Sequence, residues 1–169
     1  MLFAPKQSLS LAEHANNGDI MDKKDQQILR ELQKNGRLSN AELAERVNLS
    51  PSPCLRRLRM LEKSGVIEGY TAIVNQKAYG LPVTVFIQIR LDHHSTEAAQ
   101  EFERRIQNID EIIDCHLMTG DTDYLLRVVV ESLEAYETFI RERIHPIPSI
   151  ASINTSFAYG VVKQSRCLP

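Results

Sequence analysis

The sequence predicts an α+β protein in two parts, a small three-helix head followed by a body in which strands and helices alternate. Two observations carry this prediction. Between residues 22 and 65, apolar residues recur every three to four positions in three short stretches, which is typical of helices. Between residues 83 and 159, β-branched apolar runs alternate with amphipathic stretches, and the alternation occurs twice. This order favours a helix-turn-helix head and a βαββαβ body.

The first two helices of the head have clear start and stop signals. Residues 22–34 place Ile28, Leu29 and Leu32 on one face, and Asn35-Gly36 is a helix stop. Asp22 or Asp25 is the expected N-terminal cap. A second helix begins at Ser39, which forms a capping box with Glu42 three residues later. Its narrow apolar face consists of Ala41, Leu43, Ala44 and Val47.

The third helix begins after a tight polar turn. Ser50 at the cap and Pro51 at the first helical position are the favoured pair for a helix start, and Pro53 is tolerated within the first turn. Gly65 ends this helix. Its apolar stripe is Leu55, Leu58 and Leu61 with Cys54, and its other faces carry Arg56, Arg57, Arg59 and Lys63. The β-rich residues 66–74 then predict a small two-stranded wing or a strand leaving the head.

The body reads as two copies of one strand–helix–strand unit. The expected strands are 83–91, 112–119, 124–130 and 150–159, and the expected helices are 96–107 and 133–144. At an offset of 37 residues, Ser95, Glu97, Ala98 and Phe102 repeat as Ser132, Glu134, Ala135 and Phe139. Two such copies give a ferredoxin-like βαββαβ sheet with both helices on one face. Since a bare apolar sheet face needs cover, we expect a homodimer.

Charge is unevenly divided between head and body. Residues 22–75 hold 10 Lys/Arg against 7 Asp/Glu, whereas residues 76–169 hold 9 against 13, within a chain of formal net charge −2. A basic head on an acidic body fits a polyanion-binding head and a body with another task.

Several classes of protein are disfavoured. The three cysteines have no disulfide or zinc-ligand spacing, which indicates a reducing compartment. The start of the chain is a poor signal peptide, and no apolar run approaches the ~18 residues of a membrane span, so we expect a cytoplasmic protein. The five histidines have no nearby ligand set, so we expect no metal and no cofactor. We also find no catalytic constellation.

The head is the candidate DNA-binding site. In a helix-turn-helix, the third helix lies in the major groove, where Arg56 or Arg57 is placed to donate to guanine. The second helix offers its positive end to phosphates. The alternative is an ordinary helical bundle with a solvated basic face. The candidate DNA-binding residues are Ser39, Asn40, Ser50, Ser52, Pro53, Arg56, Arg57, Arg59 and Lys63.

The second candidate site is the turn between the middle strands of the body. Gly120 permits a positive φ and a close backbone approach, and Asp121 and Asp123 flank it as caps or acceptors. The alternative is a plain hairpin connection between two strands.

Two motifs together resemble a known family. The run SNAELAERVNLSPSPCLRRLRMLEKSGVIEGYTA is similar to the head of the Lrp/AsnC regulators, and CHLMTGDTDYLLRVVV resembles their effector-domain signature. The resemblance covers about residues 21–168. It implies a winged helix-turn-helix, a βαββαβ effector domain of the RAM/ACT-like type, dimers that assemble into tetramers or octamers, and an amino acid as effector.

The resemblance also implies roles for the turn. Backbone groups at Thr119, Gly120 and Asp121 would hold the zwitterion, and Asp123 would receive the ammonium. Met118 and Tyr124 would line the side-chain pocket between subunits.

We therefore expect a sequence-specific DNA-binding transcription regulator, not an enzyme, with double-stranded DNA, an amino acid and a second copy of itself as partners. The alternatives are an effector-independent architectural DNA-binding protein and a small ferredoxin-like dimeric enzyme. The expected parts are an arm or leader at 1–20, a head at 21–74, a linker at 75–82, an effector and oligomerisation domain at 83–160, and a tail at 161–169.

Overall fold

The computed structural model describes residues 21–93, 95–165 and 167–168. They form two compact units, which are described separately below. One comprises the described residues up to Thr71 and those from Ser165 onward, and the other runs from Ala72 to Gln164. The predicted arm at residues 1–20 lies outside the described residues.

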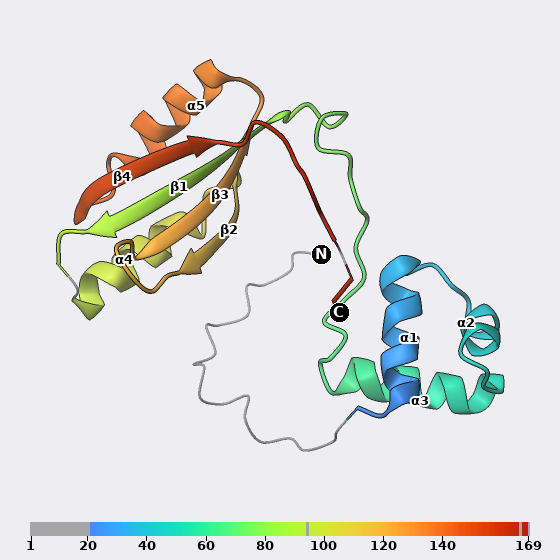
Figure 1. The fold of residues 1–169 in the computed structure, drawn as a ribbon. Helices are drawn as coiled ribbons and strands as arrows, with labels where there is room; N and C mark the ends of the chain where they lie inside the picture. The colour runs from blue at the N-terminus through green and yellow to red at the C-terminus, as the bar shows by residue number, and fades with distance from the viewer. Residues whose placement is uncertain (1–20, 94, 166, 169) are drawn as a thin grey trace. The chain divides into compact units, whose positions relative to one another are not determined.

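The head consists of α1 (Lys23–Lys34), α2 (Asn40–Arg46) and α3 (Pro51–Lys63) (Figure 1). Asp22 caps α1 and Ser39 caps α2, each in a complete capping box. These boxes explain why the two helices begin where the sequence predicts. At α3 the structure has Pro51 at the first helical position, but the Ser50 side chain makes no capping hydrogen bond. Proline thus fixes the start of α3 without help from the cap.

The three helices close around one small apolar core. Its buried members are Ile28, Leu43, Ala44, Val47, Cys54 and Leu61. Leu58 packs against this core, but Leu55 lies beside exposed basic residues of α3. Leu55 is half-buried, and Ala41 is exposed. The expectation that Leu55 and Ala41 belong to the core faces is therefore wrong, because the helical period that buries Cys54, Leu58 and Leu61 turns Leu55 outward.

Residues 66–74 follow α3 without regular structure. Ile67 packs against the head core, and its N–H donates to the Leu61 carbonyl at 3.1 Å. The Tyr70 hydroxyl donates to Glu62 at 2.9 Å. The described chain has one sheet only, of four strands, and none of them comes from this segment. The strand pairing expected for a wing is thus absent from the described residues, since strand geometry needs a neighbouring strand to exchange hydrogen bonds.

The body contains the predicted βαββαβ order. It comprises β1 (Val83–Leu91), α4 (Thr96–Ile106), β2 (Ile112–Leu117), β3 (Tyr124–Val130), α5 (Leu133–Phe139), a π-helical turn (Ile140–Ile144) and β4 (Ile150–Phe157). The strands lie in the order β2-β3-β1-β4, and every neighbouring pair is antiparallel. Ser95 and Ser132 cap α4 and α5 in the same way, as the internal repeat requires.

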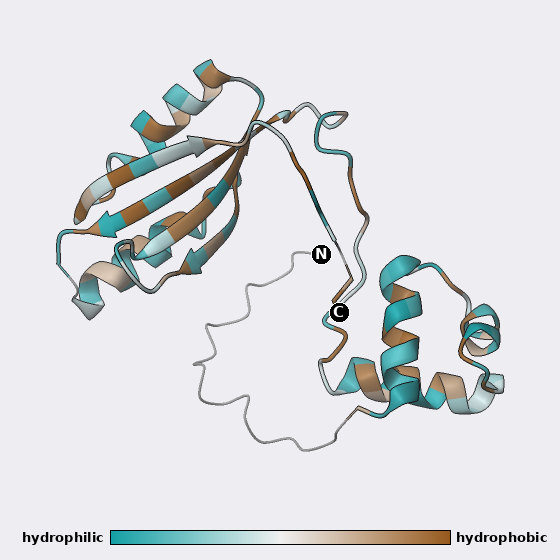
Figure 2. Ribbon diagram, in the orientation of Figure 1, coloured by the Kyte–Doolittle hydropathy of each residue, from teal (hydrophilic) through white to brown (hydrophobic). Residues whose placement is uncertain are grey.

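Both helices cover one face of this sheet. Phe102 and Ile106 of α4 and Tyr136 and Phe139 of α5 share a core with the alternate strand residues, among them Val85, Ile87, Ile89, Leu126 and Val128. The alternation of apolar and polar residues along the strands can be followed in Figure 2. It sends one side chain in two into the core.

The other face of the sheet differs from the expectation. Along β1 it carries Phe86, Gln88 and Arg90, all exposed. Beside Phe86, the ladder places Arg127, whose guanidinium forms an ion pair with Asp114 at 2.6 Å. The face mixes polar and apolar side chains, so the expectation of a bare apolar surface is wrong. The homodimer stays a prediction, which rests on the family resemblance.

Candidate DNA-binding surface and effector turn

The outer face of α3 carries a stripe of polar and basic side chains. Ser52, Arg56, Arg59 and Lys63 are all exposed and follow one another at intervals of four, three and four residues. This spacing places them on one helix face. Together with Leu55 and Met60 they line a shallow hollow. We call this set of six residues the α3 surface.

The start of α3 has few backbone donors. Pro51 and Pro53 have no N–H, so among the first three residues of the helix only Ser52 has one. A helix start of this kind is a poor anion site by itself. The exposed side chains of Ser50 and Ser52, rather than a row of amides, are the polar groups available here.

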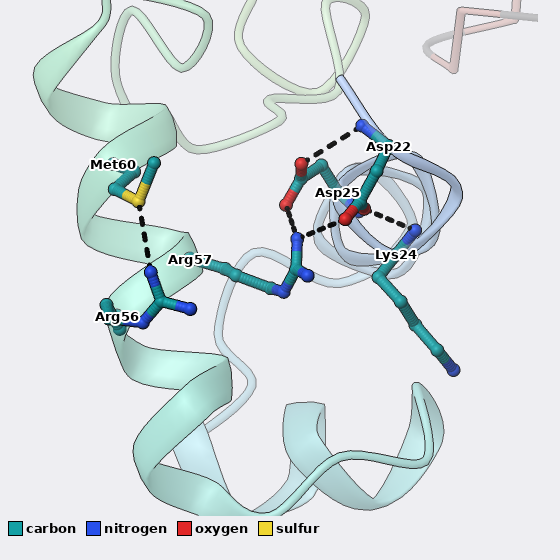
Figure 3. A network of polar contacts seen from close by, with 6 residues as sticks. All are labelled: Asp22, Lys24, Asp25, Arg56, Arg57 and Met60. Atoms are coloured by element: carbon teal, nitrogen blue, oxygen red, sulfur yellow. Dashed lines mark hydrogen bonds and ion pairs between the residues drawn. The ribbon is translucent and has the colours of Figure 1, made fainter. Parts of the chain in front are cut away.

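Arg57 lies apart from the α3 surface. Its Nη1 lies 2.7 Å from Asp22 Oδ2 and 2.9 Å from Asp25 Oδ1, and its side chain is 26% exposed. Figure 3 shows Arg57 reaching across to the start of α1, whereas Arg56 stays beside its own helix near Met60. The structure therefore separates two arginines that adjoin in the sequence, and it does not bring Arg57 together with the other predicted DNA contacts.

Ser39 and Asn40 also hold internal bonds. Ser39 N–H and Oγ both donate to Glu42, each at 2.7 Å. Asn40 Nδ2 donates to the Pro51 carbonyl at 2.9 Å and so joins α2 to the start of α3. The Glu42 carboxylate keeps a lowered pKa, mainly because the Ser39 hydroxyl and N–H donate to it. The charge at the start of α2 is therefore negative, which makes this helix end less suited to phosphate than the sequence suggested.

Residues 118–123, between β2 and β3, form the candidate effector site and are called the effector turn below. This turn is closed by a backbone hydrogen bond. Met118 N–H donates to the Asp123 carbonyl at 2.8 Å, and Gly120 between them has a φ of 110°. The side chains or backbones of Met118, Thr119, Gly120 and Asp121 are exposed. The left-handed backbone at Gly120 confirms why glycine is needed at this point of the turn.

Asp123 anchors the turn to β1. Its carboxylate accepts the Leu91 N–H at 2.7 Å, and its own N–H donates to the Ile89 carbonyl at 2.9 Å. Asp123 is thus an acceptor, as the sequence suggested, and its partner on β1 is what holds the turn.

Tyr124 points into the helix-covered core and is 3% exposed. Its ring lies 4.5 Å from the Phe102 ring, centre to centre, and its hydroxyl donates to Glu103 at 3.0 Å. Burial, and then the bond to the Glu103 carboxylate, raise the pKa of Tyr124 well above its usual range. Tyr124 therefore does not join the exposed residues of the turn.

Sequence reasoning missed four residues at these sites. Leu55 and Met60 belong to the α3 surface, and the helical spacing was the signal that could have placed them there. Asp22 and Asp25 were read as caps alone, although they also bind Arg57. An Asp-x-x-Asp start gave no hint of a partner 32 residues away.

Other kinds of site receive no support within the described part of the chain. None of its groups of His, Cys, Asp and Glu is arranged to hold a metal ion. In that same part, no helix has the length and apolar character to cross a bilayer.

Comparison with known proteins decides the family. Residues 21–68 match the winged helix-turn-helix DNA-binding family, and residues 84–168 match the Lrp/AsnC ligand binding domain. The chain belongs to the Lrp/AsnC family. It is a DNA-binding transcription regulator with a ligand-binding domain, and its relatives in this family are regulators rather than enzymes.

Individual relatives match over nearly the whole chain. The leucine-responsive regulatory protein of Escherichia coli (strain K12) is 41% identical over 151 residues, which are 89% of this chain and 92% of the relative. The structure of a transcriptional regulator from Neisseria meningitidis in complex with L-Met matches with a TM-score of 0.85 and 35% identity, over 89% of this chain and 97% of that one. An AsnC family regulator from Agrobacterium tumefaciens matches with a TM-score of 0.84 and 38% identity, over 88% and 97%.

Proposed function

We propose that this Lrp/AsnC regulator binds its operator through the α3 surface and that a free amino acid, bound at the effector turn of paired subunits, alters operator affinity. The observation that carries the proposal is the stripe of Ser52, Arg56, Arg59 and Lys63 on one exposed helix face. Exposed cations can release counterions from DNA, whereas cations in internal ion pairs cannot do so without losing their partners.

The α3 surface has the mixture that base reading requires. Arg56 and Arg59 can donate to guanine, and Leu55 and Met60 can contact thymine methyl groups. The Arg56 guanidinium lies 3.8 Å from Met60 Sδ, which holds it over its own helix. Lys63, one turn beyond Arg59, is placed for a phosphate.

An amino acid is supported as effector by the chemistry of the turn. Backbone groups of Thr119 and Gly120 can meet a carboxylate, and the exposed Asp121 carboxylate can accept an ammonium. Because Asp123 is half-buried and its Oδ2 accepts the Leu91 N–H, whereas Asp121 is exposed, we assign the ammonium to Asp121. One relative is named leucine-responsive and one similar structure holds L-Met, which favours an apolar or sulfur-containing side chain.

A second subunit completes the effector site in this proposal. Met118, Thr119, Gly120 and Asp121 are exposed in a single chain, so one side of any ligand bound there would face water. A second copy placed against the turn would supply the missing wall and would pair two α3 surfaces for a two-fold site.

The test uses the full chain. Isothermal calorimetry with each of the twenty amino acids is followed by light scattering with and without the amino acid that binds. We expect heat with a small apolar or sulfur-containing amino acid and a dimer or larger assembly. Asp121→Asn should weaken binding about tenfold or more, because a charged partner of the ammonium is lost. Asp110→Asn, at another exposed aspartate of the body, should leave it unchanged.

The effector-independent architectural protein is the alternative. It predicts tight DNA binding together with no heat from any amino acid. A monomer that binds an amino acid would contradict the shared site while leaving the DNA-binding function intact.

A further inference from the structure

The first turn of α1 fastens α3 through a single guanidinium nitrogen. Asp22 Oδ1 accepts the N–H groups of Lys24 and Asp25, at 2.8 and 2.9 Å, and its Oδ2 lies 2.7 Å from Arg57 Nη1. Asp25 Oδ2 accepts the Asp22 N–H at 3.1 Å, and its Oδ1 accepts Arg57 Nη1 at 2.9 Å. Each carboxylate thus uses one oxygen for the capping box and the other for Arg57 (Figure 3).

The same turn also holds α2. Lys24 Nζ donates to the Val47 carbonyl at 2.5 Å, at the C-terminal end of α2. Further along α1, Glu31 pairs with Arg46 of α2 at 3.2 Å. The start of α1 is therefore bonded to both other helices of the head. These directional bonds help to orient helices whose shared core has only six buried side chains.

Charge and position both argue against a contact between Arg57 and DNA. Arg57 follows Cys54 by three residues and precedes Leu61 by four, which places it on the core side of α3. Two carboxylates surround its one positive charge, so the cluster carries a net negative charge. A phosphate brought to this cluster would be repelled, unlike one brought to Arg56 or Arg59.

We infer that Arg57 is a positioning residue, which binds Asp22 and Asp25 and thereby fixes the direction in which α3 presents Arg56 and Arg59, and that it does not touch DNA. This inference rests on the proposed use of the α3 surface. It replaces the sequence-based expectation that Arg57 donates to guanine. It also gives Asp22 and Asp25 an effect on operator affinity, although neither is a group that DNA would attract.

The experiment compares Arg57 with its neighbour on one DNA probe. A duplex selected from a random pool with the wild-type chain is labelled, and its affinity is measured by fluorescence anisotropy over a series of salt concentrations. The variants are Arg57→Ala, Asp25→Arg, the combined Asp25→Arg/Arg57→Asp, and Arg56→Ala as the matched control. Thermal melts of each variant accompany the titrations.

A residue that contacts phosphate and a positioning residue differ in the salt slope. Arg56→Ala should lower the affinity and flatten the slope of log affinity against log salt by about one. Arg57→Ala should lower the affinity about tenfold at an unchanged slope, because its charge was never given to DNA. The combined variant restores an ion pair with reversed polarity between positions 25 and 57, although it gives up the Asp25 half of the capping box and places a carboxylate near Asp22. It should therefore bind DNA more tightly than Asp25→Arg, which places two cations side by side, but more weakly than wild type.

Three results would overturn the inference: a slope flattened by Arg57→Ala as by Arg56→Ala, an affinity that Arg57→Ala leaves unchanged, or a combined variant no tighter than Asp25→Arg. We call the bonds of Arg57 to Asp22 and Asp25 the clamp, and a measurement without DNA tests it separately. NMR titration of the Asp22 carboxyl should show a higher pKa in Arg57→Ala than in wild type. An unchanged pKa would mean that Arg57 does not bind this carboxylate. If the wild-type chain enriches no duplex, the proposed function is wrong, while the NMR titration still decides the contact.

Discussion

The α3 surface and the effector turn differ in how much of each a single chain completes. On α3, the four polar residues of the stripe are exposed together, and the residues that hold them in place, Arg57 and Asn40, are bonded within the head. At the turn, Asp123 and Tyr124 are bonded within the body, but the remaining residues face solvent. The residues of the α3 surface are thus positioned within one head, whereas in the proposed function a second copy completes the site at the turn.

The comparison shows that each motif contains two kinds of polar residue. In each motif, some polar groups build the local structure and others face solvent, where the proposed ligands would meet them. The two groups are interleaved in the sequence, as Arg56 beside Arg57 and Asp121 near Asp123 show. Substitutions that separate the two groups therefore test the comparison directly.

The largest effect is expected from removing the cations of the α3 surface together. The combined Arg56→Ala, Arg59→Ala and Lys63→Ala variant should lose about a hundredfold or more in affinity for the selected duplex, with a salt slope flatter by about three. Its unfolding free energy should stay within about 0.5 kcal/mol of wild type, because all three side chains are exposed. Anisotropy and denaturant unfolding measure the two quantities.

The control removes the same charge elsewhere. Lys77, Arg141 and Lys163 are exposed residues outside the α3 surface. Their combined alanine variant should keep most of the affinity and the slope. Equal losses in both variants would mean that net charge, rather than the α3 surface, determines DNA binding.

Helix capping and periodicity explain how much of this structure the sequence could predict. Asp22 and Ser39 are local signals, and each caps its helix as expected. The repeat of Phe102 as Phe139 predicted that both helices share one core, which the structure confirms. Signals that act over a few residues, or that repeat, can be read without coordinates.

The partners of polar side chains could not be read in the same way. Arg57 meets Asp25 across 32 residues, and Asp123 meets Leu91 across the same separation, so only the folded chain brings them together. For Arg57 the helical spacing to Cys54 and Leu61 was an available signal that pointed inward. The β propensity of residues 66–74 favoured strand structure, but the described part of the chain has no strand that pairs with this segment.

The second prediction concerns the backbone of the turn. Gly120→Ala forces a side chain into a φ of 110°, although a Cβ there would meet no atom within 4 Å. The cost is therefore conformational, about 1–2 kcal/mol of unfolding free energy, and the amino-acid response should be lost. Gly160→Ala is the control, because that glycine also has open space but no positive φ. Both variants are measured by calorimetry with the amino acid and by denaturant unfolding. If the two variants behaved alike, the role proposed for the turn would be contradicted.

The third prediction separates Tyr124 from the effector site. Tyr124→Phe removes the hydroxyl bond to Glu103 and should lower the unfolding free energy by about 1 kcal/mol, with amino-acid affinity unchanged. If the binding free energy fell by more than the unfolding free energy, Tyr124 would instead belong to the binding pocket.

Tyr124 also has a signature at alkaline pH. Since its pKa is raised by burial and by Glu103, the folded protein keeps a proton that the unfolded chain releases above about pH 10. The stability that this bond contributes is therefore present below that pH and declines as pH rises further. Tyr124→Phe should weaken this decline. The pKa of Tyr70 in the head is also raised, to about 12, by burial and by Glu62. Tyr70 should therefore still contribute to the decline of stability at alkaline pH in Tyr124→Phe.

The smallest effect is expected at the clamp in acid. The pKa of Asp22 is lowered, first by the Asp25 N–H and also by Arg57 and the Lys24 N–H. Its contribution to stability is therefore present at neutral pH and is lost as pH falls from the usual aspartate pKa of about 3.9 through the lowered value. Asp22→Asn should melt earlier than wild type at pH 7, and the gap should narrow in acid.

Asp110→Asn, an exposed change in the body, should show no such convergence. A gap that stays constant from neutral pH into acid would mean that Asp22 acts through its shape as a cap and not through its charge. That result would weaken the clamp without affecting the α3 surface. Convergence, together with the unchanged salt slope expected for Arg57→Ala, would place the charge of Arg57 inside the head and leave Arg56 and Arg59 as the arginines that α3 gives to DNA.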